Sequence, residues 1–168
     1  MKVDDLLHSP GAWLRAGVGV DIVISSRIRL ARNVEGAAFP GWAGEEECVR
    51  LCRTLSSTIM KLPVIGTPIL WEMAELEPVD REFLCERHLI STELAARGHG
   101  SALVLRRDES LSVMINEEDH LRIQAMRPGM ELAALWKEID RLDTEIENDV
   151  RYAYSPRLGY LTACPTNV

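Results

Sequence analysis

Three apolar segments separated by short polar turns constrain the fold of this chain more than any other feature. The turns carry Asp108-Glu109 and Glu117-Glu118-Asp119, and the apolar segments cover residues 102–106, 111–115 and 120–126. Consecutive strands joined by tight turns form an antiparallel meander. We therefore predict an antiparallel sheet at the centre of the fold.

The rest of the chain alternates between helical periodicity and short strand-like runs. Two amphipathic helices are predicted over residues 45–60 and 130–148. Their apolar stripes consist of Cys48, Cys52, Leu55 and Ile59 in the first, and Leu132, Leu135, Trp136, Ile139, Leu142 and Ile146 in the second. Shorter helices are predicted at 4–15, 79–88 and 92–97, and further strands at 21–30, 68–72, 151–154 and 160–163.

These elements indicate an α/β (α+β) fold in which helices flank an antiparallel sheet. We expect a short helical lead over residues 1–20, followed by a single domain over residues 21–168. A chain of 168 residues with 46% hydrophobic and 27% charged residues is large enough for one core.

The charge and the composition narrow the function classes. The net charge of −7 argues against nonspecific nucleic-acid binding. No run of about eighteen apolar residues occurs, which argues against a membrane span, and the acidic N-terminus does not resemble a secretory signal. A cytoplasmic protein is expected. Its four cysteines form no Cys-x-x-Cys pair and its histidines lack ligand spacing, so no metal site is predicted.

The first candidate site is Ser25-Ser26-Arg27-Ile28-Arg29. Side chains two residues apart on a strand point the same way, with Cα atoms roughly 6.5–7 Å apart. Arg27 and Arg29 would therefore project together, away from Ile28. Two guanidinium groups at this spacing suit a polyphosphate, because each can bind phosphate oxygens through two hydrogen bonds. Two surface arginines on a solvated strand face would give the same pattern.

The second candidate site is the turn that holds Glu117 and Glu118, together with Arg122 on the strand that follows. A carboxylate can hold a guanidinium group and remove a proton from it, which an acceptor that is fully protonated near neutral pH requires. By strand parity, Arg122 should reach the same face as His120. An ordinary acidic β-turn is the alternative.

Cys164 and His88 complete the set of candidates. Cys164 precedes Pro165 at the end of a predicted strand, where a thiolate would complement a guanidinium group; the alternative is a buried, inert cysteine. His88 ends a short helix, where it could stack on a base or only cap the helix. No phosphate-binding glycine loop occurs, so arginines would have to hold the phosphates of any bound nucleotide.

Together these motifs resemble the catalytic domain of the phosphagen (ATP:guanido) kinases. The resemblance runs from about residue 20 to the last residue, with Ser25–Arg29, His88, Asn116–Arg122 and Cys164–Asn167 in the family's order. Only about twenty residues precede the Ser-Ser-Arg strand, where creatine and arginine kinases carry a helical domain. Within the family the chain is therefore similar to the bacterial protein-arginine kinases.

The resemblance implies roles for individual residues. The phosphate-binding and nucleotide-binding set is Ser25, Ser26, Arg27, Ile28, Arg29, His88 and Arg122. Glu118 is implied as the carboxylate that holds the guanidinium group and acts as the base, with Glu117 beside it and Cys164 close by. The implied cofactor is ATP with Mg²⁺ carried by the nucleotide. The implied partners are arginine-bearing proteins, an activator protein and the Clp protease system, with a possible homodimer.

The chain departs from the family pattern at its end. In the family, Cys-Pro-Thr-Asn-Val continues into Gly-Thr-Gly-Leu-Arg and further phosphate-binding arginines, whereas this chain stops at Val168. We therefore expect the N-terminal part of a catalytic domain, with an unpaired sheet edge. The alternatives to a protein-arginine kinase are a kinase of a small guanidino compound such as free arginine, and a non-catalytic relative that only binds ligand.

Overall fold

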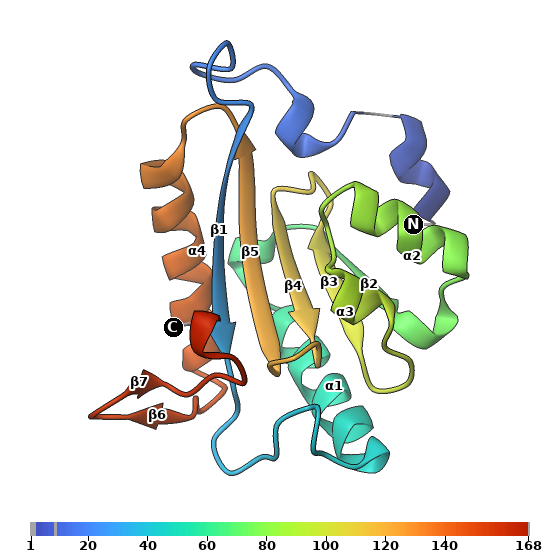
Figure 1. The fold of residues 1–168 in the computed structure, drawn as a ribbon, viewed down its shortest axis with the longest axis vertical. Helices are drawn as coiled ribbons and strands as arrows, with labels where there is room; N and C mark the ends of the chain where they lie inside the picture. The colour runs from blue at the N-terminus through green and yellow to red at the C-terminus, as the bar shows by residue number, and fades with distance from the viewer. Residues whose placement is uncertain (1–2, 9, 168) are drawn as a thin grey trace.

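A five-stranded antiparallel sheet forms the centre of the molecule (Figure 1). The structure is a computed structural model that describes residues 3–8 and 10–167. The strand order is β1-β5-β4-β3-β2, with β1 at Ser25–Arg32, β2 at Pro68–Glu72, β3 at Ala102–Arg106, β4 at Leu111–Ile115 and β5 at Leu121–Pro128. The predicted meander of three strands is confirmed as β3, β4 and β5, which pair in sequence order.

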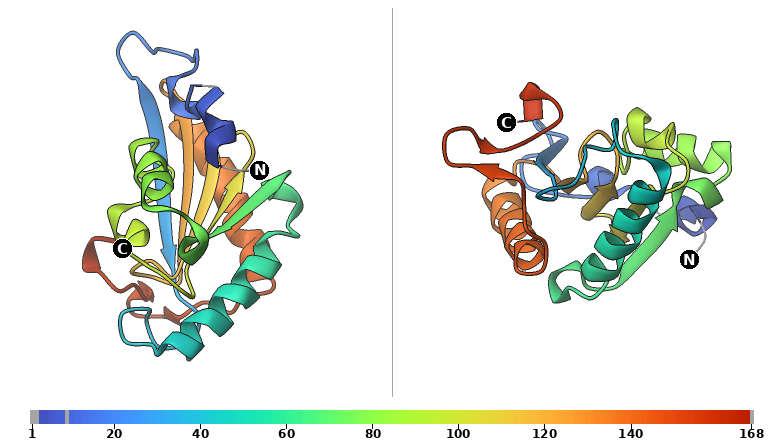
Figure 2. Two further views of the ribbon diagram at one scale, coloured as in Figure 1. Left: turned by 90° about the vertical axis from the view of Figure 1, so that its right-hand side faces the viewer. Right: turned by 90° about the horizontal axis from the view of Figure 1, so that it is seen from below.

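Two long helices cover one face of this sheet (Figure 2). They are α1 at Glu45–Ile59 and α4 at Leu132–Glu147. Alternate residues of the strands face them, because side chains along a strand point to opposite faces in turn. The larger core cluster lies here and includes Leu55 and Ile59 of α1, Leu135, Ile139, Leu142 and Ile146 of α4, and Val104, Val113, Ile115, Leu121 and Ile123 of the sheet.

The opposite face of the sheet is only partly covered. The helices α2 at Pro78–Glu86 and α3 at Thr92–Ala95, with the 3-10 segment η1 at Val3–His8, pack over the half formed by β2, β3 and β4. The apolar residues beneath them are Ile69, Trp71, Leu103, Leu105 and Met114. Towards β5 and β1 the same face becomes polar, since Gln124 pairs with Arg29 and Arg122 pairs with Ala31 across the two strands. This polar half of the face carries the candidate site.

The first strand and the N-terminal lead differ from the prediction. The predicted strand at 21–30 begins instead at Ser25 and continues to Arg32. Gly19 has a positive φ of 70°, and residues 19–22 form a turn that leaves Ile22 92% exposed. The predicted helix at 4–15 consists of η1 and a second 3-10 segment, η2, at Ala12–Leu14, with Pro10 and Gly11 between them. Proline lacks the N–H that a continuous helix would need there.

The apolar stripe of α4 is narrower than predicted. Leu135, Ile139, Leu142 and Ile146 are buried as expected, but Leu132 and Trp136 are about half exposed. Trp136 directly follows Leu135, which turns it about 100° around the helix axis from that buried residue, and Leu132 is the first residue of α4. Near the C-terminus, the predicted strands shorten to β6 at Tyr154–Ser155 and β7 at Gly159–Tyr160, and Tyr152 forms an isolated bridge with Val34.

Short 3-10 segments complete the described chain: η3 at Pro63–Ile65, η4 at Met73–Glu75 and η5 at Pro165–Asn167. Within the described ranges, none of the helices has the length and apolar character needed to cross a membrane.

Candidate functional site

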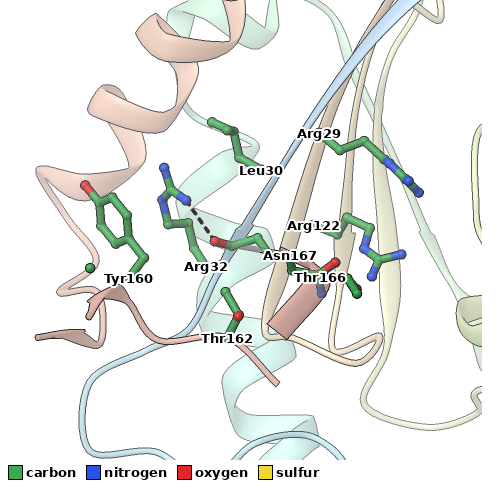
Figure 3. Close-up of a pocket in the computed structure, with 10 residues that line it drawn as sticks. Arg29, Leu30, Arg32, Arg122, Tyr160, Thr162, Thr166 and Asn167 are labelled. Atoms are coloured by element: carbon green, nitrogen blue, oxygen red, sulfur yellow. Dashed lines mark hydrogen bonds between the residues drawn. The ribbon is translucent and has the colours of Figure 1, made fainter. Parts of the chain in front are cut away.

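Three arginines gather on the polar half of this sheet face. Arg27 and Arg29 are exposed on β1, whereas Ile28 and Leu30 between and beside them pack against the core. Arg122 comes from the neighbouring strand β5, and it lies on the same side of β1 as Arg29 (Figure 3). Partial burial and the positive charges of Arg27 and Arg122 lower the pKa of Arg29. A cluster of like charges that lowers a guanidinium pKa is suited to binding an anion.

A cavity of about 440 Å³ runs along the outer edge of β1 beside these arginines (Figure 3). Arg29 and Arg122 line it together with Thr162, Thr166 and Asn167 of the C-terminal segment. Arg32 points to the other side of β1, where its guanidinium group lies 3.7 Å from the ring centroid of Tyr160 and forms an ion pair with Asp143. Among the described arginines of β1, Arg27 and Arg29 therefore remain on the ligand side, next to Arg122 of β5.

Asn116 fixes the turn between β4 and β5. Its φ is 55°, a left-handed conformation that asparagine tolerates better than most residues. Its side-chain amide donates to the carbonyl oxygens of Cys48 at 2.9 Å and Gly100 at 2.7 Å. The turn that carries the carboxylates is thus tied to α1 and to the start of β3.

The two glutamates of the turn occupy different environments. The Glu117 side chain is fully buried, pairs with Nη1 of Arg122 at 2.8 Å and accepts a hydrogen bond from the Ser91 hydroxyl. The Glu118 side chain is 45% exposed and pairs with Nη2 of Arg122 at 3.1 Å. Arg97 donates to the backbone oxygen of Glu117 at 2.6 Å. Glu117 is therefore held within the protein, and Glu118 is the carboxylate that a ligand can reach.

His120 is separate from this ion-pair network, contrary to the parity prediction. Its ring is buried, with Nδ1 accepting from the backbone N–H of Val34 at 3.1 Å and Nε2 lying 3.0 Å from the oxygen of Ala38. Arg122 instead contacts the two glutamates. The parity argument fails here because β5 begins only at Leu121, so His120 belongs to the turn. Burial lowers the pKa of His120, which keeps the ring neutral.

Asp119 is a structural centre that the sequence reasoning missed. This buried carboxylate accepts hydrogen bonds from the Asn33 amide at 2.6 Å, the Ala163 backbone N–H at 2.6 Å and the Asn167 amide at 2.9 Å. It thereby fastens the segment that carries Cys164 to the turn that carries Glu118. A third acidic residue in a turn gives no sequence signal for this role, because its partners are distant in the chain.

Cys164 and His88 lie at the border of the site. The Cys164 thiol is half-buried and lies 2.9 Å from the Thr166 hydroxyl. His88 is exposed, has a φ of 59°, and its backbone oxygen accepts from the Gln124 amide at 2.7 Å. Because Gln124 pairs with Arg29 across the strands, His88 lies next to the arginine cluster. Its ring stands 5.0 Å from the ring of Trp13 in η2.

The remaining residues of the predicted nucleotide set serve the fold. The Ser26 hydroxyl is buried, donates to the Gly129 oxygen at 2.7 Å and accepts from the Glu131 N–H at 3.1 Å. Ile28 packs on the core, and Ser25 pairs with Pro128 at the end of β1. Their contacts hold β1 in the register that exposes Arg27 and Arg29.

The comparison with protein families agrees with this arrangement. Residues 56–168 match the model of the ATP:guanido phosphotransferase C-terminal catalytic domain. This chain belongs to the ATP:guanido phosphotransferase family. It is 46% identical over 166 residues to the protein-arginine kinase of Moorella thermoacetica, covering 96% of this chain and 47% of that protein. It is 39% identical to the protein-arginine kinase of Symbiobacterium thermophilum, covering 93% of this chain and 45% of that protein.

The predicted resemblance to bacterial protein-arginine kinases is thus confirmed, and the chain spans about half the length of these relatives. Solved structures of the family share the fold. The duplicated taurocyamine kinase of Schistosoma mansoni, with bound transition state analog components, superposes with a TM-score of 0.82 at 24% identity, covering 99% of this chain and 24% of that one. A lombricine kinase superposes with a TM-score of 0.73 at 24% identity, covering 85% of this chain and 44% of that one.

Proposed function

We propose that this chain forms part of an enzyme that transfers the γ-phosphoryl group of ATP to the guanidinium group of arginine residues in proteins. The observation that carries the proposal is the ion pair between Arg122 and Glu118 at 3.1 Å. It joins a cluster of phosphate-binding cations to a reachable carboxylate suited to a guanidinium group. Donor and acceptor would therefore meet at this pair.

The residues divide the chemistry between them. Arg27, Arg29 and Arg122 neutralise the phosphates of ATP and align them. His88 lies on the side where the adenine base binds. Glu118 aligns the acceptor guanidinium and takes its proton as the new N–P bond forms and the bond from the γ-phosphorus to ADP breaks. Glu117 positions Arg122 through their ion pair. Cys164 lies on the acceptor side, and Mg²⁺ arrives bound to the nucleotide phosphates.

The proposed acceptor follows from the relatives. Several relatives at 38–46% identity are protein-arginine kinases, which supports arginine-bearing proteins as substrates. From the family resemblance we also propose a cytoplasmic protein that works with an activator protein and the Clp protease system, with a homodimer as the assembled form. We propose no role in nucleic-acid binding, since the net charge is −7.

The test compares two acceptors, and the unmodified protein with one variant. The protein is incubated with ATP and either free arginine or an arginine-rich protein, and acid-labile phosphoarginine is measured by phosphorus NMR. We expect phosphoarginine on the protein and none with Glu118→Gln. Label on free arginine alone would favour a small-molecule kinase. Nucleotide binding without label on either acceptor would favour a non-catalytic relative.

A further inference from the structure

A second cavity of about 440 Å³ opens beside Glu118. It is lined by Phe39, Gly41, Trp42, Arg97, Glu118 and Ala163. None of these residues lines the cavity along β1, where Arg29 and Arg122 lie. The Arg122–Glu118 ion pair therefore stands between two cavities, one cationic and one with a carboxylate and two aromatic rings.

The aromatic rings come from the loop between β1 and α1, which passes below the β4–β5 turn in Figure 1. The backbone N–H groups of Trp42 and Ala43 both donate to the oxygen of Phe39, which closes a tight turn. This turn presents Trp42 with 88% of its surface exposed. An indole ring attracts a guanidinium group over its face, and its apolar surface suits a methylene chain.

The charged groups of the cavity leave one carboxylate oxygen available. Arg122 engages Oε2 of Glu118, so that Oε1 can accept from a second guanidinium group. Arg97 is already engaged, because its Nη2 donates to the backbone oxygen of Glu117 at 2.6 Å. Ala163 places the neighbouring Cys164 at the same wall. Carboxylate, aromatic rings and thiol-bearing segment thus surround one space.

We propose that the aromatic wall of this cavity, formed by Phe39 and Trp42, recognises the acceptor arginine side chain of a peptide segment. The guanidinium group lies against Glu118, the methylene stem lies between Phe39 and Trp42, and the peptide backbone stays outside. The inference rests on the proposed function for its acceptor chemistry, and it adds Phe39 and Trp42 as specificity-determining residues. Free arginine differs because it places a charged amino group and a charged carboxylate at the apolar rim, where a peptide places neutral amides.

The test uses the indole N–H signals of the chain's four tryptophans, Trp13, Trp42, Trp71 and Trp136. An acetylated and amidated tripeptide with a central arginine is titrated into the unmodified protein and followed by NMR. We expect the Trp42 signal to shift progressively. The Trp136 signal should stay in place, because Trp136 lies on α4 and is also exposed, at 51%, but lies outside the cavity. The same tripeptide with citrulline, which is neutral, should cause no shift.

Variants give a second readout. Trp42→Ala should weaken binding of the tripeptide about fivefold, as expected for losing the apolar contact with the methylene stem of the arginine. Trp42→Phe should retain most of the affinity, and Trp136→Ala should leave it unchanged. Equal shifts with the citrulline peptide, or tighter binding of free arginine than of the capped tripeptide, would overturn the inference.

The outcomes separate this inference from the proposed function. Phosphoarginine formation that depends on Glu118, combined with a silent Trp42 signal, would refute the arginine cavity and leave the proposed function intact. A Trp42 shift specific for the arginine peptide, without phosphoryl transfer to any acceptor, would support the cavity and refute the proposed function.

Discussion

Arg122 forms ion pairs with both glutamates of the β4–β5 turn, through Nη1 to Glu117 at 2.8 Å and Nη2 to Glu118 at 3.1 Å. The two adjacent carboxylates differ in exposure, at 0% and 45% of their side-chain surface. Burial makes the first a part of the fold, because an unpaired buried charge is costly. Exposure leaves the second available for a substrate.

This difference predicts opposite effects of the same substitution at neighbouring positions. Glu118→Gln should abolish phosphoryl transfer and change the free energy of unfolding by no more than about 0.5 kcal/mol. Glu117→Gln should lower the free energy of unfolding by about 3 kcal/mol, since it breaks a buried ion pair. Urea unfolding and phosphoarginine measurements on both variants check this. Similar unfolding free energies for the two would contradict the assignment.

Arg29 should lower the free energy of unfolding and promote anion binding. Partial burial and the positive charges of Arg27 and Arg122 lower its pKa, so Arg29→Gln should raise the free energy of unfolding, by about 0.5 kcal/mol, as desolvation and repulsion of the charge are relieved. Inorganic triphosphate should raise the melting temperature of the unmodified protein and have a much smaller effect on the variant. Arg53→Gln, on the exposed side of α1, is the matched control. Equal stabilisation by triphosphate in both variants would rule out the phosphate role.

The free energy of unfolding should fall as the pH is lowered and His120 begins to titrate. Burial lowers the pKa of the folded His120 below its ordinary value of 6.5, so the unfolded chain binds a proton first as the pH falls. The contribution of neutral His120 to the free energy of unfolding is present above pH 6.5. It is lost as the pH falls from 6.5 through the lower pKa of the folded state. Between pH 7.5 and 5.5 we expect a loss on the order of 1 kcal/mol, measured by urea unfolding.

His120→Gln should remove this component of the pH dependence, so that the difference in unfolding free energy between the variant and the unmodified protein shrinks as the pH falls. His99→Gln, at an exposed position, is the matched control. A constant difference across the pH range would show that His120 does not titrate in this window.

Cys164 should react first with a thiol reagent at pH 8. Burial raises the pKa of Cys52 to about 11 and also raises the pKa of Cys48 and Cys85, which reduces the thiolate fraction at all three. Mass spectrometry after brief iodoacetamide treatment should place the label on Cys164. Cys164→Ser should slow the first labelling step at least about tenfold. Early labelling of Cys85 instead would contradict this order.

Asp119 should stabilise the C-terminal segment, residues 161–167, more than it stabilises the sheet. Asp119→Ala removes the acceptor of three hydrogen bonds, from Asn33, Ala163 and Asn167. Amide hydrogen exchange should accelerate over residues 161–167, while β3 and β4 remain protected. Asp140→Ala, at an exposed position on α4, should leave exchange in this segment unchanged. Uniform acceleration over the whole chain would instead indicate a global loss of stability.

The sequence by itself determined the strands and much of the arginine cluster. Alternation predicted that Arg27 and Arg29 face away from Ile28, and turn residues predicted the meander of β3, β4 and β5. These features depend on neighbours within a few positions, which is the range over which strand periodicity and turn chemistry operate. The start of β1 was predicted four residues early, because the apolar residues Ile22 and Ile24 precede the strand and are exposed.

Only the tertiary structure decided how the carboxylates divide their roles. Burial against Ser91 and Arg122 distinguishes Glu117 from Glu118, and contacts with Asn33 and Ala163 make Asp119 structural. The same holds for the cavity in which the loop of Trp42 meets Glu118. Desolvation and hydrogen bonding depend on which distant segments pack together, and local sequence patterns carry no record of those partners.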